Sequence, residues 1–283
     1  MDLVPFFAPF YMMFFGFCLG DLGYGLVIVA GATWYKRKAK EDVKPILSLA
    51  QFLGIGTIIL GTLTGTFFGI NLLEVESLGN LRKMMLDSQK VFYLSLAVGM
   101  FQIMFGMALK AVNNYRLFGW QYAMLPVGWL ILLFGIIDVA LLKMIPGINM
   151  FIIYAGIGVI IIFSDPASGI FGRIGKGIWE LYGISGIFGD VLSYVRLFAL
   201  GISGAILGFV VNTIALQIKD SAPIIGPVFF VIFLIIGHGA NLLISSLGAF
   251  VHPMRLTFVE FYKNAGFAGG GKEYTPFRNK LIN

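Results

Sequence analysis

Long apolar runs separated by short polar loops dominate the pattern of this chain. After a first stretch at about residues 3–35, further runs cover about 46–68, 91–112, 124–142, 147–163, 184–218 and 223–262. Runs of about 18 or more nearly uncharged residues are typical of transmembrane helices, because about 20 helical residues cross the hydrocarbon core. The last two runs contain roughly 35–40 residues each, so as membrane helices they must tilt strongly, bend or project beyond the bilayer.

The first apolar stretch is interrupted by glycines and one acidic residue. A single helix over residues 3–35 has a length of roughly 50 Å, too long for a core of about 30 Å and short for two full spans. The interruption contains Gly20, Asp21, Gly23 and Gly25. We therefore predict two short helices that meet at a structural hinge near Asp21, with Asp21 capping the second helix.

These elements predict an all-α integral membrane protein with about eight transmembrane helices, the last two long and strongly tilted. We expect residues 1–263 to form the transmembrane domain and residues 264–283 a tail. Composition agrees, since 58% of the residues are hydrophobic, 12% are charged and the mean hydropathy is +0.90. A soluble domain of this size carries roughly twice that charged fraction. The first run has no basic segment before it and is not expected to be a cleavable signal.

Basic residues are distributed unevenly between the two sets of alternate loops. Because cytoplasmic loops are enriched in Lys and Arg, the richer set is predicted to be cytoplasmic, together with the carboxyl terminus. The same bias explains the net charge of +6 without any nucleic-acid partner. The richer set consists of Lys36, Arg37, Lys38, Lys40, Lys44, Lys110, Arg116, Arg173, Lys176, Lys263, Lys272, Arg278 and Lys280, and the poorer set of Arg82, Lys83, Lys90, Lys143 and Lys219.

Two arginines, Arg196 and Arg255, fall inside the last two long runs. Placing an arginine near mid-membrane costs roughly 2.5–3.5 kcal/mol or more, so each needs a reason. Arg196 is expected to share one side of its helix with Ser193, Ser203 and Gly204. An ion pathway, or a counter-charge for a mobile carboxylate, is one interpretation; a structural ion pair or a snorkelling side chain is the other.

The last run carries a stripe of polar and small residues at alternating spacings of three and four. Such a period confines its members to one face of a helix, within about 100° of arc. A polar face of this length faces protein or water, either as a wet half-channel or as packing between helices. The stripe consists of His238, Asn241, Ser245, Gly248, His252 and Arg255.

Two further residues of the last run mark its cytoplasmic end. Pro253 lacks a backbone N–H, so we expect a hinge beside His252 and Arg255. Glu260 lies off the stripe, where it lines a cytoplasmic entrance or is solvated at the membrane surface; the sequence leaves both open.

Motifs for soluble chemistry are missing from the sequence. The glycine-rich break has no following Lys-Ser/Thr, which excludes a phosphate loop. The sequence contains no His-Glu-x-x-His pattern, and its single cysteine, Cys18, lies in an apolar run and is expected to be buried and inert. We therefore expect neither a catalytic metal site nor a cofactor.

Three segments together resemble one family. They are FFGFCLGDLGYG at 14–25, GDVLSYVRL at 189–197, and AFVHPMRL at 249–256 with VEFY at 259–262. The sequence is similar, over essentially its whole length, to the membrane domain of subunit I (subunit a) of the V-type/A-type rotary ATPases. The second and third segments are the specific ones, and the first is supportive.

The resemblance implies a stator subunit rather than a catalyst. In the family, eight membrane helices pack against a rotating proteolipid ring, and the two long tilted helices present arginines that correspond to Arg196 and Arg255. A large amino-terminal cytoplasmic domain, which binds peripheral stalks, usually precedes the membrane domain and is absent from this sequence. The implied ion-translocation residues, combined with those of the stripe, are Asp190, Ser193, Arg196, His238, Asn241, Ser245, His252, Arg255 and Glu260.

Two positions depart from the eukaryotic members of the family. Gly204 stands where they carry a histidine, and Ser245 stands where they carry a glutamate. The resemblance is therefore nearer to the prokaryotic branch, for which the cytoplasmic membrane is the expected location and the transported ion is H⁺ or Na⁺.

Two other functions remain open from the residues alone. A self-contained secondary transporter is the first, with the glycine-rich break as a broken-helix binding site. A structural membrane anchor is the second, in which Arg196 tolerates replacement.

Overall fold

The structure is a computed structural model, and it describes residues 3–71, 88–139, 148–166, 168–221 and 225–267. Within these residues the chain is almost entirely helical. By length and composition, five described helical segments are able to cross a membrane, and two shorter apolar helices accompany them. The five cover residues 41–64, 89–118, 120–137, 170–221 and 226–264. The predicted class, an all-α membrane protein, is confirmed.

The predicted break in the first apolar stretch is present. Helix α1 (Val4–Leu19) ends at Gly20, whose φ of 54° lies in the left-handed region that favours glycine. Helix α2 (Leu22–Lys36) begins at once, and the carboxylate of Asp21 accepts a hydrogen bond of 3.1 Å from the Tyr24 backbone N–H. Asp21 therefore caps α2 in the manner predicted from its position.

The next predicted helix is shorter than expected. After the 3₁₀ turn η1 (Glu41–Val43), helix α3 (Lys44–Thr64) ends at Gly65, and a small antiparallel hairpin follows. Its strands are β1 (Thr66–Phe67) and β2 (Ile70–Asn71). The expectation of helix to residue 68 was wrong, because Gly65, Phe68 and Gly69 all take positive φ. Successive positive φ values at Phe68 and Gly69 are typical of tight hairpin turns.

Helices α1, α2 and α3 pack closely through glycines. A Cβ added at Gly56 of α3 is placed 2.7 Å from the backbone oxygen of Met12, and one at Gly16 of α1 is placed 2.6 Å from that of Gly56. Gly61 lies equally close to the backbone at the start of α2, where its Cβ would be 2.7 Å from the carbonyl carbon of Asp21. Small residues permit this backbone approach between membrane helices.

Gly61→Ala is expected to destabilise the protein by about 1–3 kcal/mol, because the new methyl group meets backbone that cannot move aside. The matched control is Gly31→Ala on α2, where a Cβ has nothing within 4 Å among the described residues. Thermal unfolding of both variants in the same detergent checks the prediction. Equal melting temperatures for the two variants would contradict the close packing.

The middle of the chain forms a second group of helices. Helix α5 (Ser88–Phe118) leads to α6 (Trp120–Ile137), and α7 (Asn149–Phe163) packs against α6. The predicted runs at 91–112, 124–142 and 147–163 correspond to these three helices, although residues 140–147 lie outside the described part. Helix α8 (Ile170–Tyr182) packs against α7 and continues toward the carboxyl-terminal half of the chain.

The carboxyl-terminal half contains the two longest helical segments. Helices α8, α9 (Ile184–Leu192) and α10 (Val195–Ser221) follow one another with a break at Ser193 and Tyr194. Helix α11 (Gly226–Arg255) continues into the π-helical turn η4 (Leu256–Phe261) and the short α12 (Tyr262–Asn264). At 1.5 Å per residue, the 52 residues of the first segment measure about 78 Å, far more than the hydrocarbon thickness of about 30 Å.

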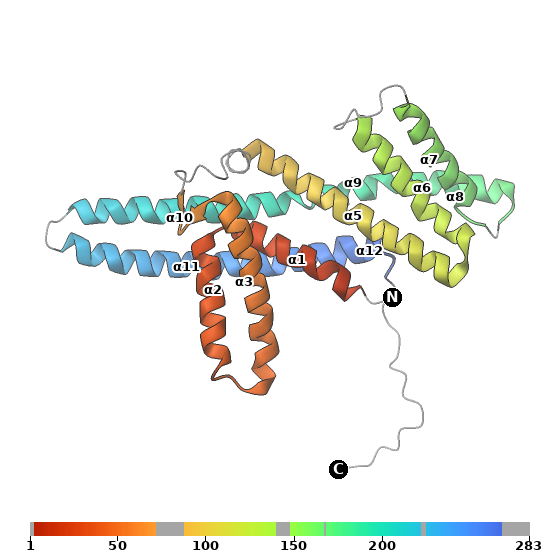
Figure 1. Cartoon of the computed structure of the whole chain (residues 1–283). Helices are drawn as coiled ribbons and strands as arrows, with labels where there is room; N and C mark the ends of the chain where they lie inside the picture. Colours follow the sequence, from red (N-terminus) through yellow and green to blue (C-terminus); the bar gives the residue numbers. More distant parts are fainter. Residues whose placement is uncertain (1–2, 72–87, 140–147, 167, 222–224, 268–283) are drawn as a thin grey trace, which may run out of the picture.

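Figure 1 shows how these groups are arranged. Helices α10 and α11 lie side by side as a long antiparallel pair, and the α2–α3 pair crosses them at a steep angle. Helices α6, α7 and α8 gather toward one end, and α5 extends along α10 to connect the groups. Helix α1 packs against α3, α10 and α11, so the core of the molecule lies between α1 and the long pair.

Candidate functional site

The register of α10 against α11 determines which polar residues meet. Glycines on both helices mark four facing positions, and Gly204 and Gly208 are buried there. Continuing the same spacing for one more turn brings Arg196 to the same level along the helix pair as His252. The facing pairs are Leu200 with Gly248, Gly204 with Ser245, Gly208 with Asn241 and Val211 with Gly237.

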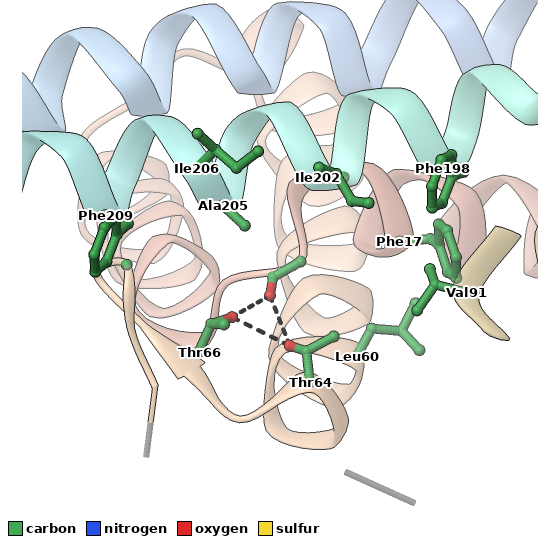
Figure 2. Close-up of a pocket in the computed structure, with 13 residues that line it drawn as sticks. Phe17, Leu60, Thr64, Thr66, Val91, Phe198, Ile202, Ala205, Ile206 and Phe209 are labelled. Atoms are coloured by element: carbon green, nitrogen blue, oxygen red, sulfur yellow. Dashed lines mark hydrogen bonds between the residues drawn. The ribbon is translucent and has the colours of Figure 1, made fainter. Parts of the chain in front are cut away.

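One face of the α10–α11 pair is covered by the rest of the protein. Asn212 and His238 lie on this covered face, and α1 contacts both long helices on it. A cavity of about 340 Å³ lies farther around α10, between this helix, the hinge at Gly20 and the hairpin. Figure 2 shows apolar side chains of α10 on one side of the cavity and Thr64 and Thr66 on the other. Both threonine hydroxyls donate hydrogen bonds to the Gly20 carbonyl.

The opposite face of the pair, which we call the free face, is exposed in the chain as described. Successive residues of a helix are rotated by about 100° around its axis. By this rotation, the α10 residues of the free face point about 80° away from the residues that face α11, on the side opposite to the cavity. Arg196 belongs to this face, and its Nη1 is buried without a hydrogen-bond partner among the described residues. The other members are Ser203, Leu207, Val210 and Ile214 on α10 and Ile244, Leu247 and Val251 on α11, all exposed.

Arg196, His252 and Arg255 lie close together at the centre of the site. Arg196 is the second residue of α10, directly after the break, and falls near the midpoint of the 52-residue helical segment. His252 lies within electrostatic range of both arginines. Arg255 is the exposed last residue of α11. Hydrogen bonding changes to the π-helical pattern directly after it, three residues beyond Pro253, and π turns occur frequently at functional sites.

Three members of the predicted stripe take part in a network that also includes residues outside it. His238 Nδ1 lies 2.8 Å from the Tyr24 hydroxyl, and His238 Nε2 lies 3.0 Å from Asn212 Oδ1. Asn241 donates to the Tyr24 hydroxyl at 2.8 Å and accepts from the Ser245 hydroxyl at 2.9 Å. We call Tyr24, Asn212, His238, Asn241 and Ser245 the histidine network.

A second polar cluster lies on the other side of Arg196. Asp190 of α9 is paired with Lys263 at 3.0 Å and accepts a hydrogen bond of 2.9 Å from Asn264. Glu260 is 2% exposed, with Oε2 unpartnered among the described residues, and lies within electrostatic range of Asp190. We call these four residues the Asp190 cluster. The burial of Glu260 contradicts the expectation that it is solvated at the surface and leaves the alternative of a lining position.

Ser193 lies at the break between α9 and α10, where the Arg196 N–H donates to the Ser193 carbonyl at 3.3 Å. The Ser193 side chain faces Glu260 and donates to the Gly189 carbonyl at 3.1 Å. Ser203 is exposed on the free face, whereas Gly204 is buried against Ser245.

Sequence reasoning missed several members of the site. Tyr24 lies between two glycines of the hinge, and nothing in the sequence singles it out. Asn212 is an isolated amide in an apolar helix, and this isolation could have identified it as a site residue. Tyr194 is fully buried and donates to Gln102 of α5 at 2.6 Å, a contact between residues far apart in the sequence. Lys263 and Asn264 were assigned to the cytoplasmic end only by charge counting and by position.

Fold and site together define a class of protein, an all-α integral membrane protein with polar clusters beside a pair of long helices. No protein-family model matches the chain. It is 30% identical to the A-type ATP synthase subunit I of Methanocaldococcus jannaschii over 96% of this chain and 44% of that protein. It is 32% identical to the A-type ATP synthase subunit I of Pyrococcus abyssi over 99% of this chain and 43% of that protein.

A bacterial relative extends the comparison. The V-type ATP synthase subunit I of Borreliella burgdorferi is 28% identical over 98% of this chain and 49% of its own length. Over nearly its whole length the chain is therefore similar to the subunit I proteins of A-type and V-type ATP synthases. It spans less than half the length of each of these three curated relatives.

Proposed function

We propose that this chain is the ion-translocating stator subunit of a V/A-type rotary ATPase and that it presents Arg196 to the carboxylates of a rotating proteolipid ring. The observation that carries the proposal is the position of Arg196, partly exposed on the free face and near the midpoint of the 52-residue helical segment. Exposed apolar side chains flank it along both long helices. An apolar face that holds a guanidinium suits a ring surface that carries one carboxylate per subunit.

The proposed mechanism rests on the cost of a charge in hydrocarbon. A ring carboxylate crosses lipid only when it is neutral, with its ion bound. At the stator it releases that ion and pairs for a short time with the guanidinium of Arg196. Arginine is suited to this role because it remains protonated and offers a planar fork to a carboxylate. Its positive charge also hinders ions from passing directly between the two aqueous paths.

The two polar clusters supply candidates for the two half-channels. The Asp190 cluster lies toward the end predicted to be cytoplasmic, and the histidine network lies toward the hairpin and the opposite membrane surface. By the helix rise, Asn212 is about 24 Å from Arg196 along α10, most of the hydrocarbon thickness. His252 and Arg255 lie between the clusters, where a path must be interrupted to prevent a leak.

The remaining assignments follow from the same proposal. The chain itself carries out no nucleotide chemistry, and H⁺ or Na⁺ flow is coupled to ATP hydrolysis or synthesis on other subunits. Residues 1–263 form the translocating domain, and residues 264–283 form a cytoplasmic tail, of which residues 268–283 lie outside the described part. Peripheral stalk subunits bind through sequence outside this chain, and the prokaryotic cytoplasmic membrane is the proposed location.

Site-directed cross-linking in the complete complex tests the proposed ring contact. Cys18 is 2% exposed, so an introduced cysteine reports without competition from it. Ser203→Cys, on the free face, is expected to form adducts with the ring subunit through a short bifunctional reagent. Thr62→Cys is the matched control, because it is also exposed but lies on α3. Ring adducts at the control position, with none at residue 203, would overturn the assigned contact face.

A further inference from the structure

The hydrogen-bond directions in the histidine network follow from its two asparagines. Asn212 Nδ2 lies 2.7 Å from the Phe68 carbonyl, which only accepts, so Nδ2 donates and Oδ1 faces His238. Asn241 Nδ2 lies 3.2 Å from the Gly204 carbonyl, which fixes the second amide in the same way. Both amide orientations are therefore set by backbone carbonyls.

These two amides determine the state of the imidazole between them. Asn212 Oδ1 is an acceptor, so His238 Nε2 carries a hydrogen and donates it. Asn241 already donates to the Tyr24 oxygen, which leaves the Tyr24 hydroxyl hydrogen for His238 Nδ1. Every donor then finds an acceptor only when Nδ1 carries no proton, since a proton there leaves the hydroxyl of Tyr24 without an acceptor. Tyr24 is 2% exposed, so that loss is not compensated by bulk water.

The resulting chain of hydrogen bonds runs in one direction, from Ser245 to the Phe68 carbonyl. A proton relay requires that each member accept a proton on one side and release one on the other. The NH₂ group of an amide has donors and no acceptor, so Asn241 and Asn212 interrupt any relay along this chain. The same bonds connect α2, α10, α11 and the hairpin, because Tyr24 bonds to two residues of α11, His238 bonds to Asn212 of α10, and Asn212 donates to the Phe68 carbonyl.

We propose that Tyr24 and Asn212 are positioning residues that hold His238 as its Nε2–H tautomer, and that the histidine network braces the wall of the ion path instead of relaying protons. The inference rests on the proposed function and refines the role of His238, Asn241 and Ser245 in it. Ions pass beside this wall in water, and the brace keeps the α10–α11 pair fixed against α2 and the hairpin.

Transport by the complete reconstituted complex separates a brace from a relay. In His238→Gln the amide oxygen replaces Nδ1 as acceptor and the amide nitrogen replaces Nε2 as donor, so the brace persists but no relay is possible. We expect this variant to retain at least half of wild-type ATP-driven ion uptake. His238→Ala and Tyr24→Phe break the brace, and we expect ATP-driven ion uptake by each variant to fall at least threefold. Tyr11→Phe is the control, because Tyr11 also donates to α11, at the Phe250 carbonyl, outside the network.

The protonation of the two ring nitrogens of His238 can be measured directly. A purely structural role of Tyr24 would leave this protonation unchanged. The full chain has two histidines, so ¹⁵N-histidine labelling in lipid bilayers gives two sets of ring signals, and His238→Gln identifies the set from His238. At pH 7.5 we expect a protonated Nε2 and an unprotonated Nδ1, with loss of this single state in Tyr24→Phe and no change in Tyr11→Phe. A protonated Nδ1 in the wild type overturns the inference.

The two proposals fail in different ways. Loss of ion uptake by at least tenfold in assembled His238→Gln, together with loss in Arg196 variants, overturns the brace and leaves the stator function intact. Normal uptake in Arg196 variants overturns the stator function, whatever the tautomer of His238.

Discussion

Arg196→Ala and Arg196→Lys are expected to abolish ATP-driven ion transport while the complex still assembles. Arg196 is partly exposed on the free face, so its replacement leaves the packing between α10 and α11 intact. In the proposed mechanism, the ionised ring carboxylate then has no partner when it faces this chain. Removing one partner of a buried charge pair costs about 3–5 kcal/mol, which corresponds to a decrease in rate of at least about a hundredfold.

The lysine variant sharpens this prediction. Lysine keeps a positive charge, but it offers a point charge instead of a planar fork and is able to deprotonate in apolar surroundings. Ion uptake and ATP hydrolysis are to be measured in the same reconstituted complex, with Arg255→Ala beside them to rank the two arginines. Arg116→Ala, at an exposed position near the end of α5, is the control. Normal uptake in both Arg196 variants would make Arg196 structural and would reopen the transporter and anchor interpretations.

Asp21→Ala is expected to have the largest effect on stability. The Asp21 carboxylate is 6% exposed and accepts hydrogen bonds from the backbone N–H groups of Tyr24, Phe68 and Gly69 at 3.1, 3.0 and 2.8 Å. Hydrogen bonds to a charged group contribute about 1.5–3 kcal/mol each, and buried unpaired N–H groups add a penalty. We expect the free energy of unfolding to fall by at least about 3 kcal/mol.

This destabilisation is also expected to reach the histidine network beside the proposed ion path. The hairpin that Asp21 holds supplies the carbonyl partner of Asn212, and a Cβ at Gly69 would lie 2.8 Å from Gly208 Cα, so the hairpin packs directly on α10. Asp21→Asn keeps one side-chain carbonyl oxygen, so we expect its free energy of unfolding to fall by about half as much as that of Asp21→Ala. Unfolding in detergent compares both variants with Asp42→Ala, which removes an exposed carboxylate. A melting temperature of Asp21→Ala equal to that of Asp42→Ala would contradict the bracing role.

The helical architecture could be predicted because each feature depends on neighbouring residues. The break at Gly20 and Asp21 and the long apolar helices both appear in the structure. Helix formation in a membrane satisfies backbone hydrogen bonds within one segment, so a local pattern is enough to place it. The hairpin after Thr64 was missed because apolar residues such as Phe67 and Phe68 are compatible with both helix and strand.

The candidate site was predictable only in part. Helical spacing placed His238, Asn241 and Ser245 on one face of α11, but it gave no indication that Tyr24, more than 200 residues earlier in the chain, donates to the first and accepts from the second. Likewise, charge alone singled out Glu260, whereas its burial against Asp190 and Ser193 depends on the break between α9 and α10.

By itself, the sequence determined the membrane class, the helices, the hinge and the positions of Arg196 and Arg255, because these follow from hydrophobicity, charge and helical period along one segment. Only the tertiary structure decided which polar groups meet, which face of the α10–α11 pair is free, and that the two asparagines orient His238. Those features depend on the register between helices that are distant in sequence. Register is set by close packing at Gly204, Gly208 and Gly69, and no local pattern encodes it.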